Sequence, residues 1–186
     1  MASSNKILLT TSRNPTSNIR TFCNDLTRVI PSIVRVNRGK MSMDEVAEKA
    51  LEYNADRAFI VDRWQGGPGK IEFFHVGVEG LVPVPPILYI AGICLQREFA
   101  PAKLKPVHSL AITHSTLNFM EIVDALSKFF NLPVLLEKEA LSDYQVAMHI
   151  SHDATRRVQI TFMLLPQNVE IGPRITIRQM EWEPPK

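Results

Sequence analysis

Cationic side chains gather in the first 40 residues of the chain. This segment holds seven basic residues and one acid, Asp25, so its net charge is +6, whereas the remaining 146 residues carry −4. Guanidinium groups bind phosphate oxygens through paired hydrogen bonds, and clustered Lys and Arg attract polyanions. The chemistry that these residues favour is therefore anion binding, with nucleic acid as the leading candidate.

Spacing places several of these cations on one side of a predicted helix. Arg20, Asn24 and Arg28 recur every four residues and so share one stripe, turned away from the apolar residues of the same helix. Arg13 comes just before the helix, where unpaired backbone N–H groups favour an anion. We call this predicted surface the basic face. Its members are Arg13, Arg20, Arg28, Arg35, Arg38 and Lys40.

Two arginines near the end of the chain form a second constellation. In residues 169–178, alternation turns Ile175 and Ile177 to one side and Arg174 and Arg178 to the other, the two arginines being about 13 Å apart at ~3.3 Å per residue. From the residue pattern alone, an ordinary half-buried strand ranks ahead of a binding strand.

Catalytic and metal-binding patterns are poorly represented. The glycines of residues 66–69 are too closely spaced for a phosphate-binding loop, so we predict a hairpin turn there. His149 and His152 are three apart on a predicted strand, face opposite sides and cannot chelate together. Asp62 and His75 are a carboxylate–imidazole pair on neighbouring predicted strands, but two residues are few for a catalytic site. We expect no catalytic residue, no metal and no cofactor.

The composition is that of a globular chain able to bury a core: 186 residues, 45% apolar and 22% charged. Apolar periodicity and turn residues predict the elements of the first half. A helix ends before Pro31, and the capping box of Ser42 and Glu45 starts another. The prolines at 83, 85 and 86 are predicted to break the chain before a strand. Predicted strands are residues 7–9, 33–36, 57–64, 70–78 and 87–96, and the first helix is residues 19–30.

The second half partly repeats the first. A strand at residues 110–115 precedes a helix at 119–130, with a capping box expected at residues 118–121; Ser115 corresponds to Ser12, and Pro133 to Pro31. Strands are predicted at residues 144–152, 156–165 and 174–180. The pattern predicts an α/β protein, one domain over residues 1–186, with an N-terminal half at 1–100 and a C-terminal half at 106–186.

The sequence predicts no membrane span and no disulfide. The longest apolar run, residues 87–95, is about half of the ~20 residues that a membrane span needs. Cys23 and Cys94 lie in apolar surroundings and are expected to be buried, reduced thiols. We expect a soluble, cytoplasmic protein.

Four segments, taken in order, resemble the Brix-domain family. Residues 10–16, Thr-Thr-Ser-Arg-Asn-Pro-Thr, are similar to its N-terminal turn into a helix, and residues 36–40 continue the likeness. Residues 62–69 are similar to its charged strand and glycine turn. Residues 169–174 are similar to its closing Gly-Pro-Arg motif.

The resemblance implies a non-enzymatic ribosome biogenesis factor, of the archaeal single-domain type, that binds precursor ribosomal RNA and other assembly factors, but no membrane or small-molecule substrate. It is most like the branch that acts on the small-subunit precursor. It also implies two similar halves with mixed sheets and packed helices, each akin to the anticodon-binding domain of class II aminoacyl-tRNA synthetases. The closing motif has been likened to an RNA-binding segment of sigma factors, so RNA contact is now favoured for Arg174 and Arg178.

Two other functions stay open. A protein–protein adaptor would use the proline-rich residues 82–89 and exposed strand edges to recruit other assembly factors. An enzyme acting on nucleic acid would need Asp62 and His75 to meet across a hairpin.

Overall fold

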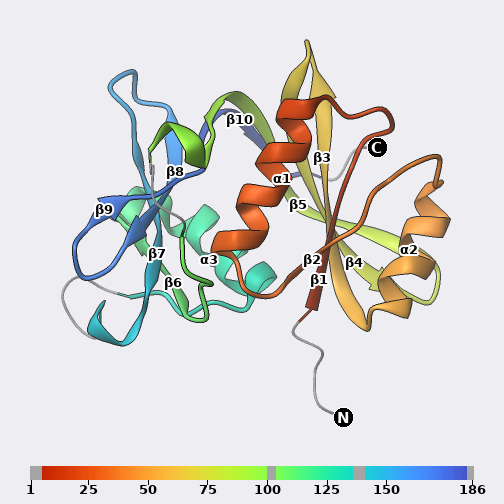
Figure 1. The fold of residues 1–186 in the computed structure, drawn as a ribbon, viewed down its shortest axis with the longest axis horizontal. Helices are drawn as coiled ribbons and strands as arrows, with labels where there is room; N and C mark the ends of the chain where they lie inside the picture. The colour runs from red at the N-terminus through yellow and green to blue at the C-terminus, as the bar shows by residue number, and fades with distance from the viewer. Residues whose placement is uncertain (1–5, 100–103, 136–140, 184–186) are drawn as a thin grey trace. The chain divides into compact units, whose positions relative to one another are not determined.

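The computed structural model describes residues 6–99, 104–135 and 141–183 of an α/β chain (Figure 1). Contacts divide these residues into two compact units. The first takes residues 6–27, 32–89 and 179–183, and the second takes residues 28–31 and 90–178, apart from the undescribed stretches. Both ends of the described chain thus belong to the first unit.

The first unit contains a mixed sheet with the strand order β2-β1-β3-β4-β5. The strand β1 lies parallel to β2 and to β3, and the remaining neighbours are antiparallel. The strands are β1 (Lys6–Thr11), β2 (Ile33–Arg35), β3 (Ala55–Trp64), β4 (Gly67–Gly77) and β5 (Gly80–Cys94), and the helices are α1 (Ser17–Val29) and α2 (Met43–Glu52). Past Tyr89, β5 continues into the second unit.

Apolar periodicity explains why the elements of the first unit form and pack. Ile7, Leu8 and Leu9 of β1 are fully buried, as expected for a parallel strand covered on both faces. The helix α2 packs Val46 and Ala50 against Leu8. The predicted capping box is confirmed, because the Ser42 hydroxyl accepts from the Glu45 N–H while the Glu45 carboxylate accepts from the Ser42 N–H.

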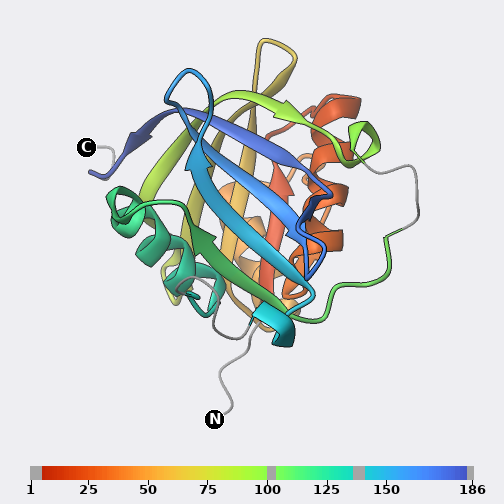
Figure 2. The same cartoon turned by 90° about the vertical axis from the view of Figure 1, so that its left-hand side faces the viewer.

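The strands of the second unit pair in the order β10-β8-β7-β6, and β9 pairs with β8. β6 and β7 are parallel, whereas β7, β8 and β10 are antiparallel. Figure 2 turns this unit toward the viewer, with α3 beside β6. Its elements are η1 (Gln96–Glu98), β6 (Leu110–His114), η2 (Leu117–Phe119), α3 (Met120–Phe130), η3 (Leu141–Asp143), β7 (Val146–His152), β8 (Val158–Leu164), β9 (Val169–Glu170) and β10 (Arg174–Glu181), whose last three residues belong to the first unit.

The two units repeat one pairing pattern, as the predicted duplication requires. In each, a first strand leads into a helix and lies parallel to a strand that begins an antiparallel series. The residues aligned in the sequence have the same role, since the Ser12 N–H donates to the Val61 carbonyl and the Ser115 N–H to the Ile150 carbonyl, both at 3.0 Å.

The prediction that prolines break the chain before residue 87 is wrong, because β5 runs through all three. The β4–β5 register jumps from the pair Ile71 and Leu88 to the pair Phe73 and Val84. Residues 85–87 therefore bulge opposite a single residue of β4, and a bulge needs no ladder hydrogen bond from a proline nitrogen.

Two smaller expectations are also corrected. No capping box forms at residues 118–121, because the chain enters α3 through η2 and Asn118 lies inside that turn.

Cys23 is fully buried, as predicted, but Cys94 is only half-buried. Burial raises the pKa of the Cys23 thiol to about 12. Residues 100–103, where the predicted N-terminal half ends, lie outside the described residues.

Candidate nucleic-acid interface

The helix α1 carries the predicted polar stripe on its exposed side. Arg20, Asn24 and Arg28 are all exposed. On the neighbouring strand β2, a terminal nitrogen of Arg35 donates to the Asn24 side-chain oxygen at 2.6 Å and its other terminal nitrogen to Asn37 at 3.3 Å. Asn24 thus holds a cation of β2 against the stripe of α1, so two elements contribute to one positive surface.

The turn between β1 and α1 presents the first cation of the basic face. Arg13 and Asn14 are exposed, and Asn14 has a positive φ of 55°, a conformation that asparagine tolerates better than most residues. The Thr16 hydroxyl lies 3.4 Å from the Ile19 N–H in the first turn of α1. The turn therefore sets Arg13 beside a helix N-terminus, where the dipole favours an anion.

Arg38 differs from the exposed cations of the basic face because it is buried, with only 8% of its surface exposed. Its Nε donates to the Met41 carbonyl at 2.7 Å, and a terminal nitrogen donates to the Thr11 carbonyl at 3.4 Å. Burial and the neighbouring Arg13 lower the pKa of Arg38. Its guanidinium thus ties the segment before α2 to the end of β1, whereas Lys40 is exposed.

Two residues that the sequence reasoning missed stand beside the N-terminal turn. Arg63 and Trp64 end β3, and both are exposed. The Arg63 N–H donates to the Ser12 hydroxyl at 3.1 Å, and its guanidinium donates to the Asn14 carbonyl at 3.4 Å. The signal was present in the predicted order of elements, because two parallel strands, β1 and β3, end at the same edge of the sheet.

The structure separates the two residues of the hypothetical nuclease site. In the β3–β4 hairpin Asp62 pairs with Lys70, whereas His75 pairs with Arg57 at the other end of the ladder. The Lys70 ammonium lies 3.3 Å from Asp62 and 3.0 Å from Glu72. The meeting of Asp62 and His75 that the enzyme hypothesis needs does not occur, and Asp62 belongs to a lysine-centred ion cluster.

The strand β10 shows the predicted alternation. Ile175 and Ile177 are buried, whereas Arg178 is exposed. Arg174 is half-buried: its Nε donates to Glu170 at 2.7 Å, a terminal nitrogen bonds to the other Glu170 oxygen, and its guanidinium lies 4.8 Å from the centre of the Phe99 ring. The bonds to Glu170 raise the pKa of Arg174. Arg174 is therefore fixed in place, and Arg178 is the arginine open to a partner.

Gly172 of the Gly-Pro-Arg motif is required by the same packing. Its φ is +64°, and a Cβ at this position would lie 2.6 Å from the Phe99 ring. The Gln96 side chain donates to the Gly172 carbonyl at 3.2 Å. The motif thus builds the local frame that presents Arg174 on β10.

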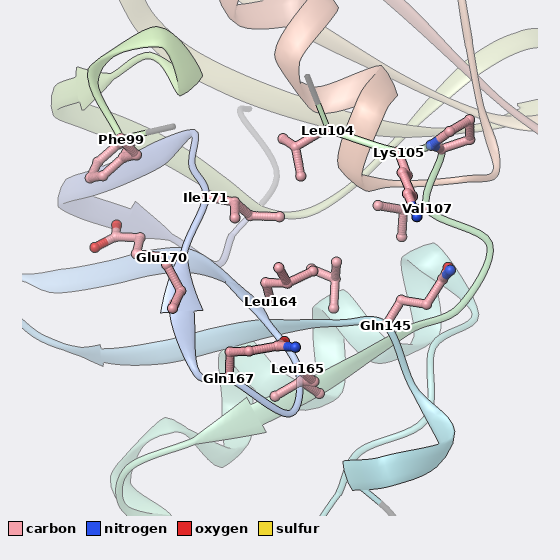
Figure 3. A pocket seen from close by; sticks show the side chains of 13 residues that line it. Phe99, Leu104, Lys105, Val107, Gln145, Leu164, Leu165, Gln167, Glu170 and Ile171 are labelled. Carbon is pink, nitrogen blue, oxygen red and sulfur yellow. The ribbon is translucent and has the colours of Figure 1, made fainter. Parts of the chain in front are cut away.

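A mostly apolar pocket of about 580 Å³ lies within the second unit (Figure 3). Leu104, Val107, Leu164 and Ile171 are among the residues that line it, and its two charged lining residues, Lys105 and Glu170, have opposite signs. Such a lining offers little to an anion. The pocket therefore adds no charged site to the exposed cations of α1, β10 and the N-terminal turn.

No metal-binding cluster occurs among the residues that the structure describes. Groups of three or more His, Cys, Asp or Glu side chains near one another are missing there. Within the same residues, no helix has both the length and the apolar character needed to cross a bilayer.

No protein-family model matches the chain. A curated protein of Pyrococcus horikoshii, "Probable Brix domain-containing ribosomal biogenesis protein", is 37% identical over 101 residues, covering 54% of this chain and 45% of the relative. The chain thus spans about half the length of such relatives. A protein of the same description from Pyrobaculum aerophilum is 31% identical over 139 residues, covering 73% of this chain and 74% of the relative.

Comparison of structures agrees over a longer span. The crystal structure of a probable ribosomal biogenesis protein from Aeropyrum pernix superposes with a TM-score of 0.77 at 28% identity, covering 97% of each chain. The mixed α/β fold is therefore shared with a solved relative. By its match to the Pyrobaculum protein, the chain belongs to the Brix domain-containing ribosomal biogenesis protein family.

Proposed function

We propose that this chain is a non-enzymatic ribosome biogenesis factor that binds precursor ribosomal RNA, in the branch that assembles the small subunit, in the cytoplasm. The observation that carries the proposal is the exposed cationic surface built by α1, β2 and the N-terminal turn. The names of the relatives, which speak of ribosomal biogenesis, support it. The likeness of each unit to an anticodon-binding domain is part of the same proposal.

Phosphates are the groups that this surface would bind. Arg13 stands at the start of α1, and Arg20 and Arg28 follow along the helix. Guanidinium groups at these positions can each grip a phosphate, and the strength of the contact then depends on salt. Phosphate contacts set affinity, whereas RNA shape sets preference.

The strand β10 would supply a second contact. Arg178 is exposed, and Arg174, about 13 Å away on the same face of the strand, is held by Glu170 and Phe99. A guanidinium already held in one orientation loses less side-chain entropy on binding than a mobile one.

Fluorescence binding of the full chain to labelled ribosomal RNA fragments across a salt series tests the proposal. Replacing Arg13, Arg20 and Lys40 by Ala removes three exposed cations and leaves the buried Arg38 in place. We expect the slope of log affinity against log salt to fall by about 2 to 3, since each phosphate contact contributes about 0.7 to 0.9.

A matched control removes the same charge elsewhere. Lys49, Lys128 and Arg157 lie outside the basic face, and Lys49 and Lys128 already pair with acids on their own helices. Their triple replacement by Ala should leave most of the slope intact. A salt-independent wild-type affinity, or an equal loss in the control, would overturn the proposal.

A protein–protein adaptor is the second candidate. The β4–β5 hairpin exposes Val78 and Val82, and Pro83 and Pro85 of the proline-rich stretch are exposed as well. Contacts with other assembly factors through this hairpin would survive nuclease treatment. Loss of every partner from nuclease-treated extracts would count against the adaptor.

A further inference from the structure

Trp64 is the most unusual side chain near the N-terminal turn. It is a large aromatic residue with 62% of its surface exposed, at the tip of the β3–β4 hairpin. Tryptophan usually buries most of its ring, because that ring is the largest apolar surface a side chain can remove from water. Nothing in the folding of the first unit requires an indole at this exposed position.

The hairpin tip is fastened to the N-terminal turn on both sides of Trp64. On one side the Arg63 N–H donates to the Ser12 hydroxyl at 3.1 Å. On the other, the Thr16 hydroxyl donates to the Gly66 carbonyl at 2.8 Å. Figures 1 and 2 both show the tip of this hairpin at the end of the unit where α1 begins. The hairpin tip that carries Trp64 is therefore anchored to the turn that carries Arg13.

The backbone beneath Trp64 also sets its position. The β3–β4 register shifts between Asp62 and Arg63, which leaves Gly69 as an extra residue on β4. A Cβ on Gly69 would lie 2.1 Å from the Trp64 Cβ, so β4 passes directly under the start of the side chain. A bulge of this kind re-aims the neighbouring side chain. The ring is thus directed outward by the main chain.

Two cations belong to the segments that the hairpin tip and the N-terminal turn bring together. Arg63 is the neighbour of Trp64 in the chain, and Arg13 lies between Ser12 and Asn14, the two residues that Arg63 contacts. An exposed aromatic face with guanidinium groups beside it is the combination that binds single-stranded nucleic acid: bases stack on the ring while cations hold the phosphates.

We propose that Trp64 is a stacking platform for an unpaired RNA base, with Arg13 and Arg63 holding the adjacent phosphates. This inference rests on the proposed function and narrows its substrate to RNA that carries a single-stranded or bulged segment. In a duplex the base faces are already stacked, so the same site gains only the phosphate contacts there.

The test uses the full chain with two probes, a 12-nucleotide oligouridine and a 12-base-pair RNA duplex. Trp64→Ala should weaken oligouridine binding about 5- to 100-fold and change duplex binding less than about twofold, because one base–aromatic stack is lost. Trp64→Phe keeps a ring and should recover part of the loss.

Fluorescence gives an independent readout. The chain has two tryptophans, so a Trp182→Phe background leaves the signal of Trp64. Oligouridine should quench this signal and the duplex should not. Unquenched Trp64 fluorescence with saturating oligouridine would overturn the inference.

Tyr53→Ala is the matched control. Tyr53 is an exposed aromatic residue, with 40% of its surface exposed, that lies just before β3 begins. The ten residues of β3 separate it from the hairpin tip by about 30 Å at ~3.3 Å per residue. Its replacement should leave both affinities unchanged.

The outcomes separate this inference from the proposed function. If the Trp64→Ala protein binds both probes as the wild type does while binding stays salt-dependent, the stacking platform is wrong and the RNA-binding function stands. If the wild type binds neither ribosomal RNA fragments nor oligouridine, the proposed function itself fails. If Trp64→Ala instead removes a protein partner after nuclease treatment, the ring is a protein anchor and the inference is overturned.

Discussion

Arg38 is a buried member of the basic face, and its guanidinium donates hydrogen bonds within the fold. Arg38→Lys keeps the charge but loses the paired geometry that reaches the Met41 and Thr11 carbonyls. We expect the free energy of unfolding to fall by about 1.5 to 3 kcal/mol, the range for hydrogen bonds to charged groups. Lys40→Ala, two residues away and exposed, should not change it. Urea unfolding of the two variants makes the comparison, and equal stabilities would show that Arg38 has no structural role.

His149 gives the second unit a pH dependence. The residue is half-buried, with its Nδ1 2.9 Å from the Thr113 hydroxyl, and burial together with the nearby His114 lowers its pKa below the usual 6.5. The unfolded chain therefore takes up a proton before the folded one does, so protonation costs stability as the pH falls below about 6.5. The penalty is absent above that pH.

His149→Gln isolates this effect, because glutamine keeps a hydrogen-bonding group and does not titrate. The urea midpoint of the wild type should drop more between pH 7.5 and pH 5 than that of the variant. Parallel pH profiles would show that other groups cause the acid sensitivity.

At the scale of the elements, the β3–β4 hairpin depends on Gly69, because a side chain at this position would collide with Trp64. Gly69→Ala would force a methyl group into the backbone and Cβ of Trp64, at separations of 2.1 to 3.1 Å. We expect a loss of about 1 to 3 kcal/mol, typical of overpacking, and a displaced hairpin tip.

Gly67→Ala serves as the control for that substitution, because nothing lies within 4 Å of a Cβ there. Thermal unfolding followed by circular dichroism compares the two. A melting temperature for Gly69→Ala equal to that of Gly67→Ala would contradict the close approach seen in the structure.

Elements with strong local signals were predictable from the sequence. The stripe of α1 and the Ser42–Glu45 capping box depend on residues within one or two turns, and both are confirmed. The prediction for β5 is wrong because a proline breaks a strand only where the ladder needs an N–H donor at that position, and that depends on the register of β4. Likewise, the approach of Arg63 to Ser12 requires the β1–β3 register, which the sequence of either strand alone does not contain.

Over the whole molecule, the uneven charge has a consequence for selectivity. The acidic balance of residues 41–186, −4 in all, should repel RNA that does not fit the basic face. Glu121→Gln with Asp143→Asn removes two exposed acids of the second unit. We expect affinity for unrelated RNA to rise a few-fold at low salt and to return to the wild-type value at high salt. A filter-binding series with an unrelated RNA measures this, and an unchanged low-salt affinity would show that these acids do not limit binding.

Assembly of the first unit depends on the order in which the chain is made. Its contacts include residues that follow the second unit in the sequence: the Tyr89 hydroxyl donates to the Glu181 carboxylate at 2.8 Å, and residues 179–183 cluster with this unit. Folding during synthesis proceeds from the N-terminus, yet this unit lacks part of its contacts until the whole second unit has been translated. The first unit therefore completes its fold only after residue 181 has emerged from the ribosome, so its final maturation follows the synthesis of the whole second unit.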